Sequence, residues 1–164
     1  MQTSVSDEMG YGREGMIADT RNRTVETRVV EADLPAGRFV VKGTVDKGAI
    51  LPSATGNITN GDLLGVTVFD SSKEYVSATH EYEQYDTVPV LRKGTVWMMA
   101  EDACTEGDAV FVRFTAGAGE ECGRVRSDAD TADAVAAPSC VFRSSTTSTD
   151  ELILVEVNLP GAIA

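Results

Sequence analysis

The sequence lacks the features typical of membrane, secreted and nucleic-acid-binding proteins. No apolar run approaches the roughly 18 residues of a membrane-spanning helix. Residues 1–15 show no basic segment followed by an apolar one, so we expect no signal peptide. Basic residues are scarce, with 14 Lys and Arg against 26 Asp and Glu and a net charge of −12. Because binding to phosphates needs a basic face, we expect no direct nucleic-acid partner and no membrane partner.

Residue types that commonly catalyse reactions or bind metals are also few. Cys104, Cys122 and Cys140 form no CxxC pair, and an odd number without a signal peptide predicts free thiols in a reducing cytosol. His80 is the only histidine, and no serine lies in a GxSxG-like turn where a histidine could activate it. The acidic run at 128–133 lacks the glycine and the closing glutamate of a calcium loop. We therefore predict that the protein is not an enzyme and has no cofactor or metal.

The apolar residues that are present favour strands. The chain has 20 Val against only 8 Leu, together with 17 Thr and 15 Gly. β-branched side chains lose rotamer freedom in a helix but fit a pleated sheet. We therefore predict an all-β protein, a small β-barrel or β-sandwich (jelly-roll-like) with at most one short helix.

Short apolar runs separated by turn signals place the expected strands. They cover 38–44, 63–69, 86–91, 95–100, 109–115, 139–143 and 151–159. The segment Arg92-Lys93-Gly94 predicts a hairpin turn between the third and fourth runs. Pro89 cannot donate a backbone hydrogen bond, so we expect its strand at a sheet edge or a bulge. Only residues 127–137 are expected to be helical, with Ser127 as the cap and Pro138 after the end.

The run TVWMMA at 95–100 predicts a strand whose two faces are both apolar. Alternate residues of a strand point to opposite sides, so Trp97 and Met99 share one face while Val96 and Met98 share the other. Either both faces are covered by the core or one of them is an interface. Core packing is our expectation for most of these side chains.

Residues 1–27 differ from the rest because their apolar residues follow neither a strand nor a helix period. We predict an extended N-terminal arm over residues 1–27 and a single β domain over residues 28–164. A frayed end explains the missing period equally well, but a purely solvated tail does not need the apolar residues Tyr11, Met16 and Ile17.

The order of several motifs resembles the capsid cement or decoration proteins of tailed bacteriophages. The motifs are G-x-V-x-x-G-A-I-L at 43–51, D-x-V-P-V-L-x-x-G-T-V-W at 86–97 and G-D-x-V-F-V-R at 107–113. Each is a turn-and-strand pattern of low specificity, and their order carries the resemblance, which extends over residues 15–161. The family offers no catalytic residues to transfer.

The resemblance implies a virion protein on the outer surface of the head, which clamps adjacent major capsid proteins against internal DNA pressure. Its partners would be the major capsid protein and further copies of itself, as a dimer or trimer. Before assembly it would lie in the cytoplasm of the infected bacterium. The arm residues expected to contact the capsid are Tyr11, Arg13, Met16, Ile17, Arg21 and Arg23.

Two other classes of protein stay open at this point. One is another phage structural module, such as a tail-tube or fibre-base protein. The other is an all-β trimeric nucleotide hydrolase, for which the length and fold are suitable. The hydrolase would need an Asp-bearing substrate motif and a Gly/Ser-rich phosphate loop, and we find neither in the sequence.

Overall fold

The computed structural model describes residues 12–73 and 81–160. Over these residues the chain is almost entirely β, as predicted. One sheet contains nine strands: β1 (Thr24–Val30), β3 (Phe39–Lys42), β4 (Gly48–Ile50), β5 (Leu63–Thr67), β7 (Thr87–Ala100), β8 (Ala109–Arg113), β9 (Val125–Arg126), β10 (Ala134–Phe142) and β11 (Glu151–Asn158). A second, two-stranded sheet pairs β2 (Leu34–Pro35) with β6 (Glu81–Tyr82).

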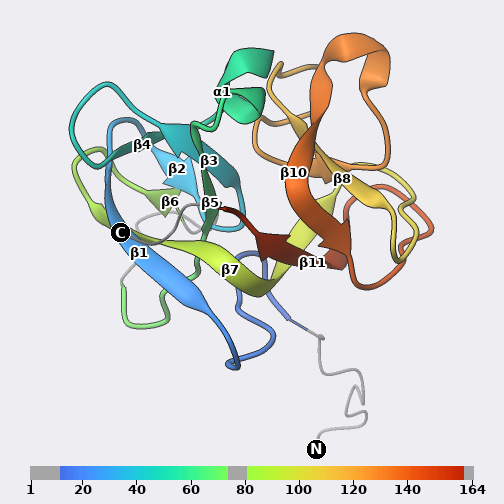
Figure 1. The fold of residues 1–164 in the computed structure, drawn as a ribbon, viewed down its shortest axis with the longest axis horizontal. Coiled ribbons are helices and arrows are strands. Elements are labelled where there is room, and N and C mark those ends of the chain that lie inside the picture. Colours follow the sequence, from blue (N-terminus) through green and yellow to red (C-terminus); the bar gives the residue numbers. More distant parts are fainter. Residues whose placement is uncertain (1–11, 74–80, 161–164) are drawn as a thin grey trace, which may run out of the picture.

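The large sheet closes on itself twice, and β7 belongs to both closed rings. One ring runs β1-β4-β3-β5-β7 and closes through the antiparallel pairing of β1 with β7. The other runs β7-β11-β10-β8-β9 and closes through the parallel pairing of β7 with β9. In Figure 1, β1 to β6 lie in the left half and β8 to β11 in the right half, with β7 running between them. The fold is therefore a small five-stranded barrel with additional strands that form a second ring.

Two hydrophobic clusters fill this architecture. The smaller one gathers side chains of the first ring, among them Val30, Val40 and Val90, all 0 % exposed. The larger one fills the second ring and extends to the opposite faces of β3 and β5. Alternate residues of β11 point into it, among them Ile153 and Val155. Burial on both faces explains why the strands that lie between the rings are nearly continuous apolar runs.

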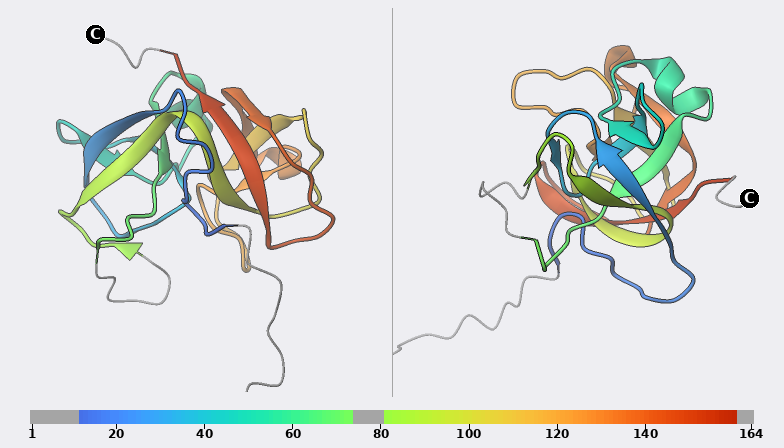
Figure 2. Two further views of the ribbon diagram at one scale, coloured as in Figure 1. Left: turned by 90° about the horizontal axis from the view of Figure 1, so that it is seen from below. Right: turned by 90° about the vertical axis from the view of Figure 1, so that its left-hand side faces the viewer.

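The predicted hairpin at Arg92-Lys93-Gly94 is wrong, because β7 continues through it as one strand of 14 residues. Thr24 pairs with Lys93 and Val25 with Leu91, so the register skips Arg92 and the strand bulges there. Gly94 has a φ of +135°, which suits a bend inside a strand. The expected turn residues thus bend β7 from one ring into the other (Figure 2).

Pro89 does not lie at a sheet edge, because β1 and β5 flank β7 on both sides. Its carbonyl accepts a hydrogen bond from the Val68 N–H at 2.9 Å. Proline has no N–H to return the second bond of this pair, and β5 ends one residue earlier, at Thr67. Pro89 therefore ends the pairing of β5 with β7 inside the sheet.

The predicted helix over residues 127–137 is also wrong. Ser127 does not cap a helix; its backbone N–H and hydroxyl both donate to the carboxylate of Asp102, at 2.9 and 2.7 Å. A single 3-10 turn follows at Asp130–Ala132, and β10 begins at Ala134. The carboxylate of Asp130 accepts a 2.6 Å bond from Arg113, so distant partners override the local helical preference.

The short α-helix lies elsewhere, at α1 (Thr55–Thr59), and closes one end of the larger cluster with Ile58. The side-chain amide oxygen (Oδ1) of Asn57 accepts the backbone N–H groups of Ser53 and Ala54, at 3.1 and 3.0 Å. These bonds fix the first turn of α1. Among the described residues no helix is long and apolar enough to cross a membrane.

Candidate functional site

Residues 12–18, which we name the strap, lie along β7 and pair with it through an isolated β-bridge between Ile17 and Val96. The Gly15 N–H donates to the Trp97 carbonyl at 2.8 Å, and the Trp97 N–H donates to the Met16 carbonyl at 2.9 Å. The Ala18 N–H donates to the Thr95 carbonyl at 2.9 Å. This part of the predicted arm is therefore bonded to the barrel at the point where β7 enters the second ring.

Gly15 allows the strap to approach the barrel backbone closely. Its φ is +81°, and a Cβ at this position would lie 2.7 Å from the backbone nitrogen of Gly37 and 2.9 Å from that of Phe69. The Phe69 N–H also donates to the Gly15 carbonyl at 2.8 Å. Only glycine combines the left-handed conformation with so little space.

A buried arginine adds an electrostatic anchor to the strap. Arg38 is 3 % exposed and forms ion pairs with Glu14 of the strap and Glu121 of the barrel. Burial lowers the pKa of Arg38, and its hydrogen bond with Glu121 opposes that shift. The same hydrogen bond lowers the pKa of Glu121. Because a buried guanidinium needs its carboxylates, loss of Glu14 would leave Arg38 with one partner fewer.

Beside the strap, β7 and β11 present a shared outer face, which we name the ribbon face. The register pairs Met99 with Leu152, Trp97 with Leu154, Thr95 with Glu156 and Lys93 with Asn158. The residues between them point into the core, as predicted for Val96 and Met98. Trp97 and Met99 stay half-exposed instead of packing in the core. Of the two alternatives that the sequence left for this face, core or interface, the interface is the one that remains.

One end of the ribbon face is apolar and hollowed. Trp97, Met99 and Leu152 line a groove of about 710 Å³, with residues 144–146 on its far side. The strap borders it, because a Cβ at Gly12 would lie 2.5 Å from the Trp97 ring.

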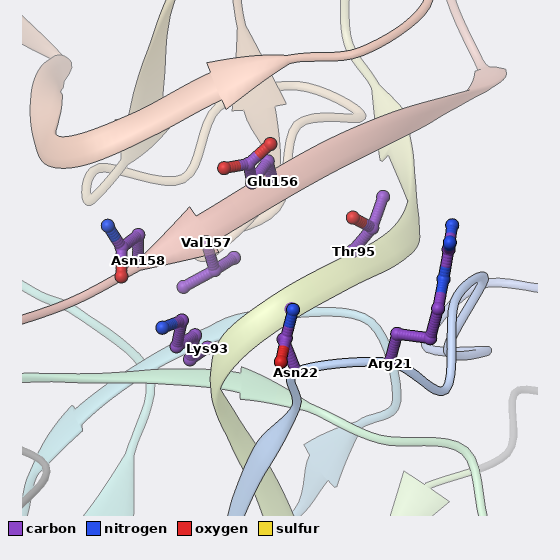
Figure 3. Close-up of a pocket in the computed structure, with 8 residues that line it drawn as sticks. Arg21, Asn22, Lys93, Thr95, Glu156, Val157 and Asn158 are labelled. Carbon is purple, nitrogen blue, oxygen red and sulfur yellow. The ribbon is translucent and has the colours of Figure 1, made fainter.

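The other end of the ribbon face is polar. Figure 3 shows Asn22 of the N-terminal segment between Arg21 and Lys93 of β7, with Glu156 and Asn158 on β11. Together with Thr95 they line a pocket of about 350 Å³.

The structure places most of the predicted arm residues at the surface. Arg13 is exposed, with its guanidinium 5.7 Å from the centre of the Phe69 ring, and Met16 is 46 % exposed. Arg21 and Arg23 are exposed as well. Ile17 is half-buried and packs against the larger hydrophobic cluster.

The remaining candidates from the sequence either form ion pairs within the fold or lie outside the described residues. Tyr11 and His80 belong to the residues that the structure does not describe. Asp130, of the acidic run at 128–133, forms a 2.6 Å ion pair with Arg113, whose side chain is 1 % exposed, and Glu101 pairs with the same arginine at 2.6 Å. No group of three or more metal-ligating side chains lies together in the described part of the chain.

Sequence reasoning missed Lys93 and the buried Arg38. Lys93 was assigned to a turn, and its position became visible only when β7 proved continuous. Arg38 was placed in an expected strand without a role, because nothing local marks an arginine whose partners are 24 and 83 residues away. The alternation in TVWMMA was the one signal that located the ribbon face.

The fold and this face define a β-barrel module whose most prominent candidate site is an outer surface beside an anchored N-terminal segment. Residues 1–158 match the family model described as structural cement protein (E217 gp24/Pam3 gp6). The chain belongs to this phage structural cement protein family, as the resemblance predicted, and it is a head-stabilising structural protein of a phage. No curated protein matches the chain, and neither alternative class is favoured.

Two solved structures resemble the fold. One comes from the capsid of Myoviridae phage XM1, with a TM-score of 0.74, 20 % identity and coverage of 96 % of this chain and 97 % of that one. The other is the head fiber gp8.5 N base of bacteriophage phi29, with a TM-score of 0.44, 11 % identity and coverage of 87 % and 99 %. The first confirms the barrel as a fold that occurs in a phage capsid.

Proposed function

We propose that this protein binds the outer surface of the assembled phage head and clamps adjacent major capsid proteins. The observation that carries the proposal is the strap, which joins an N-terminal segment with exposed cationic and apolar side chains to a rigid barrel. A body bound to one subunit holds such a segment at high effective concentration near the next subunit. A protein that binds the lattice and not loose subunits stabilises the lattice by mass action.

The segment of residues 1–27 supplies the second contact of the clamp in this proposal. Its contact residues are Tyr11, Arg13, Met16, Ile17, Arg21 and Arg23. Since Ile17 packs against the barrel core, its role is to hold the segment in place, while the exposed arginines meet acidic patches of the capsid protein. Residues 28–164 form the body of the clamp.

The remaining parts of the proposal concern partners and location. The protein assembles with itself as a dimer or trimer, because closed cyclic symmetry fits a symmetry axis of the lattice. Its charge of −12 keeps it away from nucleic acid and from anionic membranes. It acts without catalysis or cofactor, and it lies in the cytoplasm of the infected bacterium until heads assemble.

Co-sedimentation with expanded heads that lack this protein tests the proposal, with unexpanded procapsids in parallel. We expect saturable binding to expanded heads at a copy number that matches a symmetry axis. The double variant Arg21→Glu/Arg23→Glu should bind more weakly, whereas Lys42→Glu, an exposed charge reversal at the end of β3, should bind like the wild type. Absence of binding by the wild type at micromolar protein would refute the proposal.

A further inference from the structure

The ribbon face has two chemically different ends, which packing within the protein does not explain. Met99 and Leu152 form its apolar end beside the 710 Å³ groove. Lys93 and Asn158 form the other end. Between the two ends lies one strand length, because Lys93 and Met99 are six residues apart and each residue of a strand spans about 3.3 Å, or about 20 Å in total.

The polar end carries positive charge that the described residues leave unbalanced. No described carboxylate forms an ion pair with Lys93, which is exposed, or with Arg23, which precedes the Thr24 that pairs with Lys93. The other charges there are matched, since Arg21 pairs with Asp19 at 3.0 Å and Glu156 pairs with Arg143 at 2.6 Å. Lys93 therefore leaves positive charge at this end of the ribbon face, on a protein of net charge −12.

The apolar end carries acidic groups that are already engaged. Asp150 and Glu151 line the groove. Asp150 accepts a 2.8 Å bond from Arg124, and Glu151 accepts the Thr147 N–H at 2.7 Å. A ligand segment is therefore repelled at this end if it is acidic there, and accepted if it is apolar.

We propose that the ribbon face binds an extended segment of the major capsid protein, with apolar side chains at the Met99 end and acidic side chains at the Lys93 end. This inference rests on the proposed function, because the head supplies the partner. The segment spans about six residues, which matches the strand length between the two ends. Its carboxylates form ion pairs with Lys93, and its apolar side chains fill the groove beside Trp97.

Charge complementarity favours this occupant over a second copy of the chain. A second copy in antiparallel orientation would bring its own Asp150 and Glu151 to the cationic end. Both carboxylates already have partners in their own protomer. A separate acidic segment meets the cations without breaking existing bonds.

The test compares full-length variants for binding to expanded heads at low and high salt. Lys93→Glu should weaken binding at least about tenfold at low salt, because it replaces an attractive contact with a repulsive one, and high salt should reduce the difference. Lys93→Arg should bind like the wild type. Met99→Glu should also weaken binding, and Met99→Leu should preserve it. Val45→Glu, a charge introduced at an exposed valine (54 %) in the other ring, is the matched control.

The outcomes separate this inference from the proposed function. If the wild type binds heads and only the ribbon-face variants bind weakly, the inference holds. If all variants bind like the wild type, the inference is overturned and the cement role stands; if the wild type fails to bind, both fail. If Met99→Glu does not fold, the comparison of Lys93→Glu with Lys93→Arg still tests the inference, because Lys93 is exposed. A change of oligomeric state in Lys93→Glu with unchanged head binding would assign the face to a second copy and overturn the proposal.

Discussion

Replacing Gly15 by alanine tests whether the strap depends on its close approach to the barrel. The added Cβ would meet the backbone nitrogens of Gly37 and Phe69 at 2.7 and 2.9 Å. Backbone atoms cannot relieve such a contact by a rotamer change, as the end of a long side chain can. The variant should therefore lift the strap from β7, and with it the hydrogen bonds that Gly15 and its neighbours make.

Four backbone hydrogen bonds connect residues 15–18 to Trp97, Thr95 and Phe69. At about 0.5–1.5 kcal/mol each, their loss removes about 2–6 kcal/mol. The freed backbone regains conformational entropy, which offsets part of this loss and of the contacts of Glu14 and Ile17 that are lost with it. We expect the free energy of unfolding to fall by about 2–4 kcal/mol and Tm by about 4–16 °C, at 2–4 °C per kcal/mol for a domain of this size.

Gly61→Ala is the matched control. Gly61 has a similar φ of +87°, but a Cβ there meets nothing within 4 Å. It therefore carries only the cost of a left-handed alanine, about 1–2 kcal/mol. Thermal unfolding measures both variants, and trypsin cleavage at Arg13 and Arg21 reports on the strap. Equal losses of Tm in the two variants, with unchanged cleavage, would refute this account of the strap.

Three further predictions follow from the charges and thiols. Glu101→Ala should lower the free energy of unfolding by about 3 kcal/mol, because it takes a partner from a buried arginine, whereas Glu156→Ala at an exposed pair should cost under about 1 kcal/mol; equal losses in urea titrations would contradict this. Arg38 lowers the pKa of Glu121 from its ordinary 4.5, so the stabilisation is complete above that pH and is lost as the pH falls through the lowered value. In the variant Glu121→Gln, Tm should fall less steeply as the pH is lowered. If Tm depends on acid pH as it does in the wild type, this explanation is refuted. Burial raises the pKa of the Cys104 and Cys140 thiols to about 12, whereas Cys122 is less buried. Iodoacetamide should therefore modify Cys122 first, as measured by peptide mass mapping, and uniform modification of the three cysteines would be inconsistent with that burial.

The strands could be predicted because their signal is local. In 151–159 every second position from 153 on is apolar, and the structure buries Ile153, Val155, Val157 and Leu159. The excess of valine over leucine and the glycine turns were sufficient for the all-β class. Closure into a barrel required long-range pairing, and the sequence offered only the number and spacing of the strands.

The two errors share one physical cause. Glycine in a strand of 14 residues and glycine in a hairpin turn look alike in sequence, and only the pairing of β7 with β1, β5 and β11 distinguishes them. The segment from Ser127 had helical residues, but Asp102 and Arg113 bind its side chains from elsewhere in the chain. In both places tertiary bonds outweigh a local preference of about 1 kcal/mol or less per residue.

The candidate site was predictable only in part, for the same reason. Arg13, Met16, Arg21 and Arg23 could be proposed because they lie in a segment without periodicity. Lys93 was not singled out, since what marks it is that no described carboxylate forms an ion pair with it in the folded protein. Such a feature exists only after the strands have paired.

The continuity of β7 suits the proposed clamping role, because it lets both rings carry a load applied to the N-terminal segment. A load on the N-terminal segment passes through the strap into Thr95 and Trp97, which belong to the same strand as Val88 and Val90 of the other ring. Two separate strands joined by a hairpin would transmit that load to one ring alone. Because β7 contributes to both hydrophobic clusters, displacing it would have to disrupt both at once. A strap bonded to this strand is therefore attached where the protein resists deformation most.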